Sequence, residues 1–479
     1  MKRIFTITAT VLLAACAVGP DYKRPAVEVP AAYKENSPDL GWQQAEPRDT
    51  AARGNWWAMY GDARLDGLMA KADAANQSVA AAEAQVRISV ALADQARAGF
   101  WPTLNGTVQR TETKPSATTG PIVGQAVNRR IIDSLPLNAS WEADLWGRIR
   151  RQVEAGEAGT RASVSDFVNA RLSAQTALAQ SYFQLLALDS QKDLLDATVA
   201  SYGKNLELTR NRYNVGVVSR VDITQAETQL NSARAQSLDV GVQRAQLEHA
   251  IAVLIGTPAP GFTLARGTLA AAPPAPPAAG VPADLLERRP DVAAAERRVE
   301  QANAQIGVAK AAFFPTATLT GTYGYQTASP PLWFTAPSNF WSLGAALALT
   351  IFDGGRRAAL SDQALASYDQ TVAGYRGTVL QAFAEVEDNL AALRILEAEA
   401  LVQDDTVRAA QQSLDITQNQ YREGIASFLQ VAIQQTALLN AQTTALAIRA
   451  RRMIATVLLV KALGGGWEQV EKEKPKDKP

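Results

Sequence analysis

Four segments of the chain alternate between apolar and polar residues with a period of two, and each lies next to a segment with a helical period. They lie at about residues 101–113, 131–146, 314–327 and 339–352. In the clearest, one face carries Trp341, Leu343, Ala345, Leu347, Leu349 and Ile351, and the other Ser342, Gly344, Ala346, Ala348 and Thr350. A strand of about ten residues can cross a bilayer. Strands of a water-soluble sandwich alternate in the same way, but flanking aromatic residues favour a membrane wall.

Composition narrows the class of protein. The chain has 479 residues, of which 47% are hydrophobic, and this is enough for a large core. It has 47 basic and 47 acidic residues, so a nucleic-acid partner is not expected. His249 is the only histidine and has no second metal ligand or catalytic serine at a recognisable spacing. We therefore predict no enzyme activity, no metal and no cofactor.

The N-terminus has the features of a secretory signal. Lys2 and Arg3 precede an apolar run, which predicts a signal peptide at residues 1–15. Small residues directly precede Cys16, the only cysteine, and this resembles the lipobox of bacterial lipoproteins. We expect Cys16 to carry an N-acyl group and an S-diacylglycerol that anchor the segment 16–61 in outer-membrane lipid. The alternative is an unmodified cysteine left in a cleaved leader.

Two distant segments share one spacing of apolar residues, which indicates an internal repeat. The matching sets are Leu172, Thr176, Ala179, Phe183 and Leu186, and Val379, Phe383, Val386, Leu390 and Leu393, offset by 207 residues. We predict two structural repeats, 62–257 and 283–463. A connector at 258–282 contains seven prolines, and a tail follows at 464–479.

Each repeat should contain helices far longer than a globular domain needs. The expected helices are 62–98, 148–213 and 220–255, then 283–312, 356–422 and 428–463. A helix of about 65 residues is about 100 Å long. Four strands cannot close a barrel, and open edges in lipid leave backbone groups unpaired. Several chains must therefore share one barrel, with eight strands from two chains or twelve from three.

Local motifs carry a family resemblance. They are CAVGPDYKRP at 16–25, LLERRPDVAAAE at 285–296, GGGW ending at Trp467, and the paired turns after Tyr213 and Tyr421. From Cys16 to Trp467 the chain resembles the outer-membrane factor (TolC-like) family, in its lipoprotein (NodT-type) branch. The resemblance implies a mixed fold, a membrane β-barrel plus a long α-helical barrel. Four strands per chain would form a shared 12-stranded barrel in a homotrimer.

The resemblance also implies a function and partners. The expected function is a passive exit duct in the cell outer membrane with a large periplasmic extension. It would conduct drugs or other small molecules after docking to a periplasmic adaptor (membrane fusion) protein and an inner-membrane transporter. The two turns are the expected adaptor contacts, at Val215, Gly216, Val217, Ser219, Arg422, Glu423, Gly424 and Ser427. Both glycines also suit a turn that needs a positive φ.

Family members commonly narrow the periplasmic end with acidic residues, but here Ile433 stands where the aspartate is expected. Leu429 and Ile433 are therefore predicted to form an apolar aperture that closes by sterics and dewetting. Alternatively, both are ordinary packing residues. Glu142 and Asp144 are expected to face the lumen, where they hydrate the channel wall.

Other classes of protein remain open from the sequence. One is a structural or adhesive outer-membrane lipoprotein that uses its helices as a spacer, although the alternating strands disfavour it. A second is a type I secretion duct, which would have the same architecture. An independent porin has no use for helices of about 100 Å.

Overall fold

The computed structural model describes residues 17–35, 54–114, 116, 129–270, 272–274 and 288–465. The chain divides into two compact units. The first comprises Met1–Ala26, Gln85–Ser163 and Ala295–Tyr375, and the second Val27–Ala84, Val164–Ala294 and Arg376–Pro479. Within the described residues, no helix has the length and apolar character needed to cross a membrane.

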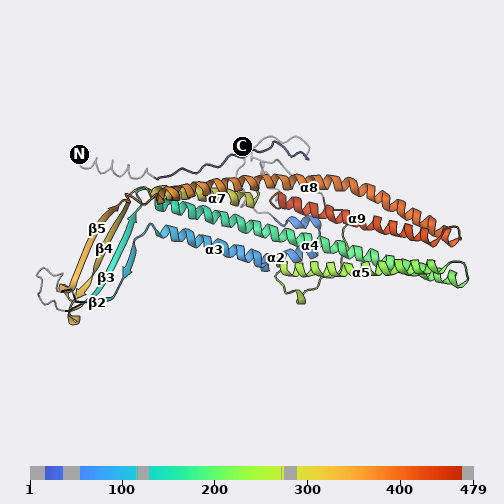
Figure 1. Cartoon of the computed structure of the whole chain (residues 1–479), viewed down its shortest axis with the longest axis horizontal. Helices are drawn as coiled ribbons and strands as arrows, with labels where there is room; N and C mark the ends of the chain where they lie inside the picture. The colour runs from blue at the N-terminus through green and yellow to red at the C-terminus, as the bar shows by residue number, and fades with distance from the viewer. Residues whose placement is uncertain are drawn as a thin grey trace, which may run out of the picture. The chain divides into compact units, whose positions relative to one another are not determined.

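The first unit contains an antiparallel sheet. Its described strands are β1 (Thr103–Gly106), β2 (Gln109–Thr113), β3 (Arg130–Ala143), β4 (Thr316–Thr327) and β5 (Asn339–Ala348), and Figure 1 shows β3, β4 and β5 side by side. Both β1 and β2 pair with β3 in one continuous register, so they occupy a single strand position. The interruption lies opposite Pro136, which has no N–H to donate to the ladder.

The register gathers the apolar residues on one face of this sheet. Leu137, Tyr323 and Trp341 form one row across β3, β4 and β5. The other face is polar, and there Thr322 Oγ1 donates to Asn138 Oδ1 at 2.9 Å. The apolar face is open to its surroundings in the single chain, since Leu343 is 80% exposed.

Two strands end earlier than the alternation predicts. β3 ends at Ala143 and β5 at Ala348, so Leu349 and Ile351 lie beyond the strand. After β3, Asp144 accepts hydrogen bonds from the backbone N–H groups of Ile149 and Arg150. Asp353 likewise accepts from two backbone N–H groups at the start of the following helix. Each aspartate caps a helix, and this local bonding replaces the strand.

The described helices are α2 (Ala63–Ala75), α3 (Gln77–Ala98), α4 (Arg148–Asn214), α5 (Arg220–Leu254), α7 (Pro290–Ala311), α8 (Arg356–Arg422) and α9 (Phe428–Ala462). Short 3-10 turns occupy Trp56–Tyr60, Ala259–Gly261, Pro330–Leu332 and Ala336–Ser338. α4 and α8 have 67 residues each, so each is about 100 Å long. The start expected at 283 for α7 lies outside the described residues; the helix begins at Pro290, where a missing N–H has no cost.

The single helix expected at 62–98 is in fact two helices that meet at Asn76. Asn76 Oδ1 accepts hydrogen bonds from the N–H groups of Ser78 and Val79, and this caps the start of α3. Its Nδ2 donates to the carbonyl of Leu254 at 2.7 Å, which ties the break to the end of α5. The helical periodicity continues through this point, so the break depends on one side chain.

The core of the second unit lies where several helices meet. Its buried residues include Trp56, Leu65, Met69, Tyr182, Leu185, Ile251 and Val457. Near the start of α7, the buried Arg289 donates to Asp291, Glu385 and the carbonyl of Ala462 at 2.6–3.2 Å. The guanidinium thereby links the ends of α7 and α9 to the middle of α8.

Residues 17–26 form an extended segment, the N-terminal strap, which packs on the helices of the first unit. Val18 N donates to the carbonyl of Trp146, and Glu296 accepts from Arg24 at 2.7 and 2.8 Å. A Cβ added at Gly19 would lie 2.6 Å from Gly307 Cα. The strap can lie this close only because both positions lack a side chain.

Candidate functional site at the helix tips and the groove between α5 and α9

The turns that join α4 to α5 and α8 to α9 have the same backbone. Gly216 N donates to Tyr213 O at 2.9 Å, and Gly424 N donates to Tyr421 O at 3.1 Å. In each turn the next N–H bonds to a carbonyl five residues back. Gly216 has φ +78° and Gly424 φ +79°, a conformation that a side chain disfavours. Both glycines therefore terminate a helix.

The helices that leave the two turns begin in the same way. Ser219 N donates to Asp222 Oδ2 at 2.9 Å, and Ser427 N donates to Gln430 Oε1 at 2.8 Å. Each serine and its partner form a capping box. The predicted contact residues Ser219 and Ser427 thus have a structural role of their own.

Apolar side chains extend from both turns into solvent. Val215 is 74% exposed and Ile425 73%, and Val217 is also exposed. Arg422 and Glu423 are exposed beside them. The structure therefore brings the predicted tip residues together at one end of the second unit (Figure 1). Ile425 is absent from the sequence prediction, although its place in the second turn matches that of Val217 in the first.

The structure also shows a contact between the end of α4 and the end of α8 that the sequence does not predict. The Arg212 guanidinium at the end of α4 lies over the Tyr421 ring, with its carbon 4.6 Å from the ring centroid. Arg212 Nη1 also donates to the main-chain carbonyl of Tyr421. The Tyr421 hydroxyl lies 3.2 Å from Thr209 Oγ1. These contacts hold the second turn against α4.

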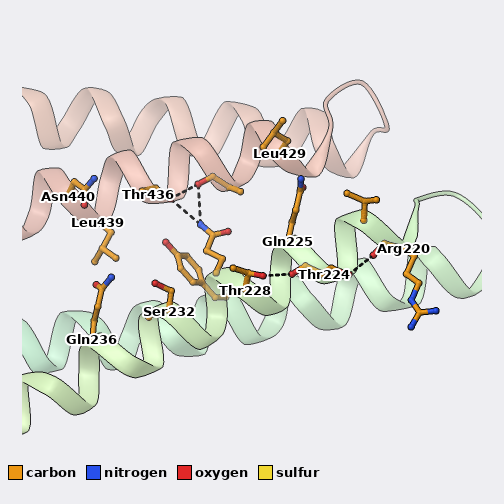
Figure 2. A pocket seen from close by; sticks show the side chains of 15 residues that line it. Arg220, Thr224, Gln225, Thr228, Ser232, Gln236, Leu429, Thr436, Leu439 and Asn440 are labelled. Atoms are coloured by element: carbon orange, nitrogen blue, oxygen red, sulfur yellow. Dashed lines mark hydrogen bonds between the residues drawn. The ribbon is translucent and has the colours of Figure 1, made fainter.

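A groove of about 770 Å³ separates α5 from α9 next to the turns. Figure 2 shows side chains from both helices pointing into it. The lining residues are Tyr202, Arg220, Val221, Thr224, Gln225, Thr228, Gln229, Ser232, Ala233, Gln236, Leu429, Ala432, Thr436, Leu439 and Asn440. Gln229 Nε2 donates to Ala432 O at 3.1 Å and so bridges the two helices.

The two residues expected at the aperture lie on the exposed side of α9. Leu429 is 50% exposed and lines the groove, and Ile433, one turn further along, is 54% exposed. Neither residue is therefore packed in the core of the single chain.

Glu142 and Asp144 have partners within the chain. Glu142 lies on the polar face of β3 and accepts from Arg148 at 2.8 and 2.9 Å. Asp144 follows the strand and caps α4. Cys16, the signal segment 1–15, residues 271 and 275–282 of the connector, and the tail from 466 onward lie outside the described residues. Among the residues that are described, no three His, Cys, Asp or Glu side chains gather as a metal site would require.

Comparison with known proteins identifies the family. The model of the family described as "Outer membrane efflux protein" matches residues 68–257 and 281–465. The chain belongs to this family. It is 32% identical over 98% of both chains to the toluene efflux pump outer membrane protein TtgF of Pseudomonas putida, and 30% identical over 98% of both chains to the pyoverdine export outer membrane protein OpmQ of Pseudomonas aeruginosa. The solved outer-membrane channel OprN aligns with a TM-score of 0.83 at 26% identity, over 94% of this chain and all of that one.

Membership in the family confirms three predictions. The fold is the TolC-like outer-membrane channel fold, with long helices and four antiparallel strand positions per chain. The chain is a channel component of outer-membrane efflux, and it is not an enzyme.

Proposed function

We propose that three copies of this chain form the exit duct of a tripartite efflux system in the outer membrane. One observation carries the proposal: the sheet has an apolar face, a polar face and two open edges. An open edge in lipid leaves N–H and C=O groups unpaired, at a cost of several kcal/mol for each group. Pairing β5 of one copy with the β1–β2 edge of the next removes every edge. Three copies then supply twelve strands.

The second element of the proposal is a lipid anchor on Cys16. Its support is the position of the strap, which reaches the junction between β3 and α4, where Val18 bonds to Trp146. This junction is the end of the sheet that leads into the helices. Acyl chains on Cys16 would therefore enter the leaflet on the periplasmic side of the membrane.

The third element is docking at the helix tips. The exposed apolar residues Val215, Val217 and Ile425 offer surface that a partner can bury. We assign this surface to the periplasmic adaptor, which connects the duct to an inner-membrane transporter. The glycines and serines of the two turns determine the backbone shape of this surface. The exposed side chains beside them would contact the adaptor.

The fourth element of the proposal is the path that the cargo follows through the duct. Leu429 and Ile433 narrow the periplasmic end, since both project from α9 next to its turn. Glu142 and Asp144 lie where the sheet meets α4, and Glu142 shares its face with Asn138. We propose that both carboxylates face the water-filled lumen of the duct. The relatives named for toluene efflux and pyoverdine export favour small molecules as cargo over secreted proteins.

Single-channel recording in planar bilayers, with the oligomer mass measured in the same detergent, tests duct and assembly together. We expect a trimer with small or flickering currents, and Leu429→Ala should enlarge them. Leu401→Ala is the matched control, because Leu401 is an exposed leucine of α8 remote from the turns. A monomer that never conducts would favour a structural or adhesive lipoprotein instead.

A further inference from the structure

The first part of α9 carries no ionisable side chain. From residue 428 to residue 448 the sequence contains only apolar, hydroxyl and carboxamide residues, and Arg449 is the next charge. Twenty-one residues of helix extend about 30 Å from the second turn. The charge-free stretch thus covers the aperture and several helical turns beyond it.

The exposed residues of this stretch form one continuous stripe. They are Leu429, Gln430, Ile433, Thr436, Ala437, Asn440, Thr444 and Ala447, spaced mainly three or four residues apart. Residues at this spacing lie on one face of a helix. From Leu429 to Ala447, the face of α9 that the described part of its own chain leaves exposed is therefore neutral.

The wall opposite α9 supplies no carboxylate to the groove either. Arg220 is the one charged side chain among the fifteen described residues that line it. Asp222 is held in the capping box of Ser219, and Glu227 is paired with Arg210 at 2.6 Å. Burial raises the pKa of the Tyr202 phenol above its usual value near 10, so this hydroxyl stays neutral at working pH. Among the described lining residues, the groove thus has a single charge, the cation of Arg220.

The rest of the lining can bind polar and apolar groups alike. Figure 2 shows the hydroxyls of Thr224, Thr228 and Ser232 and the amides of Gln225 and Gln236 along the same wall. Leu439 faces them from α9, and Leu429 of the same helix also lines the groove. Such a surface suits small amphipathic molecules that combine hydrogen-bonding groups with apolar parts.

We propose that the periplasmic entrance of this duct does not discriminate by charge, so that it admits cationic, anionic and zwitterionic amphiphiles alike. The inference rests on the proposed exit duct and adds the class of cargo. A ring of carboxylates concentrates cations and repels anions, because charges focused at a constriction raise the local concentration of the opposite ion. The aperture residues Leu429 and Ile433 carry no charge, so they exert no such effect.

Reversal potentials in a KCl gradient test the proposal, with lanthanum(III) added to the periplasmic side as a probe of acidic rings. We expect comparable permeability for K⁺ and Cl⁻ and no block by lanthanum. Ile433→Asp should raise the preference for K⁺ on the order of tenfold and introduce the block. Because Ile433 is half exposed, the new carboxylate stays solvated and the trimer mass should not change.

Gln434→Glu is the matched control, since it places the same charge one residue along the helix. Gln434 is half-buried, and its Oε1 accepts from Ser413 Oγ at 3.0 Å. This variant should behave as the wild type does. A wild-type duct that conducts but selects K⁺ and is blocked by lanthanum overturns the inference alone. Ile433→Asp without any effect also overturns it, because Ile433 would then lie off the path. A protein that forms no channel overturns the duct itself.

Discussion

Arg212 and Tyr421 lie in the last turns of α4 and α8 and contact each other. The guanidinium carbon of Arg212 lies 4.6 Å from the centroid of the Tyr421 ring, and the same guanidinium donates to the Tyr421 carbonyl. Tyr421 is only 5% exposed. The second turn is therefore fixed by a residue that belongs to the first hairpin.

Replacing Arg212 should loosen the second turn. Arg212→Gln removes the cation–π contact and weakens the bond to the carbonyl, which should cost about 1–2 kcal/mol. Hydrogen exchange at Gly424 and Ile425 should then become faster. The control is Arg210→Gln, whose partner Glu227 lies within the first hairpin. Equal exchange in both variants would show that Arg212 does not hold the turn.

The two faces of β5 should respond differently to a new charge. Leu343→Arg places a cation on the apolar face, where lipid contact should cost about 2–4 kcal/mol. Ser342→Arg places it on the polar face, beside Thr322, and should be tolerated. The measurement is the yield of folded protein in phospholipid vesicles. Equal yields of the two variants would show that the face carrying Leu343 does not contact lipid.

The contact between Gly19 and Gly307 should not accept a methyl group. Gly19→Ala strains a residue with φ +110° and drives Cβ to 2.6 Å from Gly307 Cα, at a cost of about 1–3 kcal/mol. The strap should detach, and trypsin should then cleave after Lys23. Gly241→Ala, which meets no atom within 4 Å, should leave the strap protected. A Gly19→Ala strap that resists trypsin as well as the wild type does would contradict the packing.

Replacement of Arg289 should reduce the free energy of unfolding more than replacement of any other arginine. Arg289→Met leaves Asp291 and Glu385 without their counter-charge, which should destabilise the fold by about 3 kcal/mol. Arg289→Lys keeps the charge but cannot form the bidentate hydrogen bonds of a guanidinium. Its loss of stability should therefore be intermediate. Urea unfolding of the purified oligomer measures both. The control is Arg408→Met, which removes an exposed ion pair with Asp405 and should lower stability by less than about 1 kcal/mol. An equally small loss in Arg289→Met would refute the structural role of Arg289.

The sequence predicts the parts of this fold that depend on periodicity. α4 and α8 begin where their patterns indicate and end within one residue of the expected positions. The alternation also assigns Leu137 and Trp341 to a common face, because the period of a strand is two. Long elements with a strong period leave few alternatives.

Features that depend on a single side chain or on distant contacts could not be predicted in this way. Asn76 interrupts a pattern that reads as one helix, since its cap replaces only a few backbone bonds. Arg212 and Tyr421 are separated by more than two hundred residues, and no local pattern pairs them. At the candidate site, the sequence indicates the two turns through their glycines but not the groove beside them. The groove exists only because α5 and α9 come together.

The two turns share their backbone bonds and caps but differ in their side chains, with Val215 in one where Glu423 stands in the other. A threefold assembly of such chains therefore has six ends of nearly equal shape. A ring of six identical subunits could therefore bind with one subunit at each of these six turns. Its contacts would alternate around the ring between an apolar and a charged neighbour, so chemically identical subunits would occupy two distinct environments.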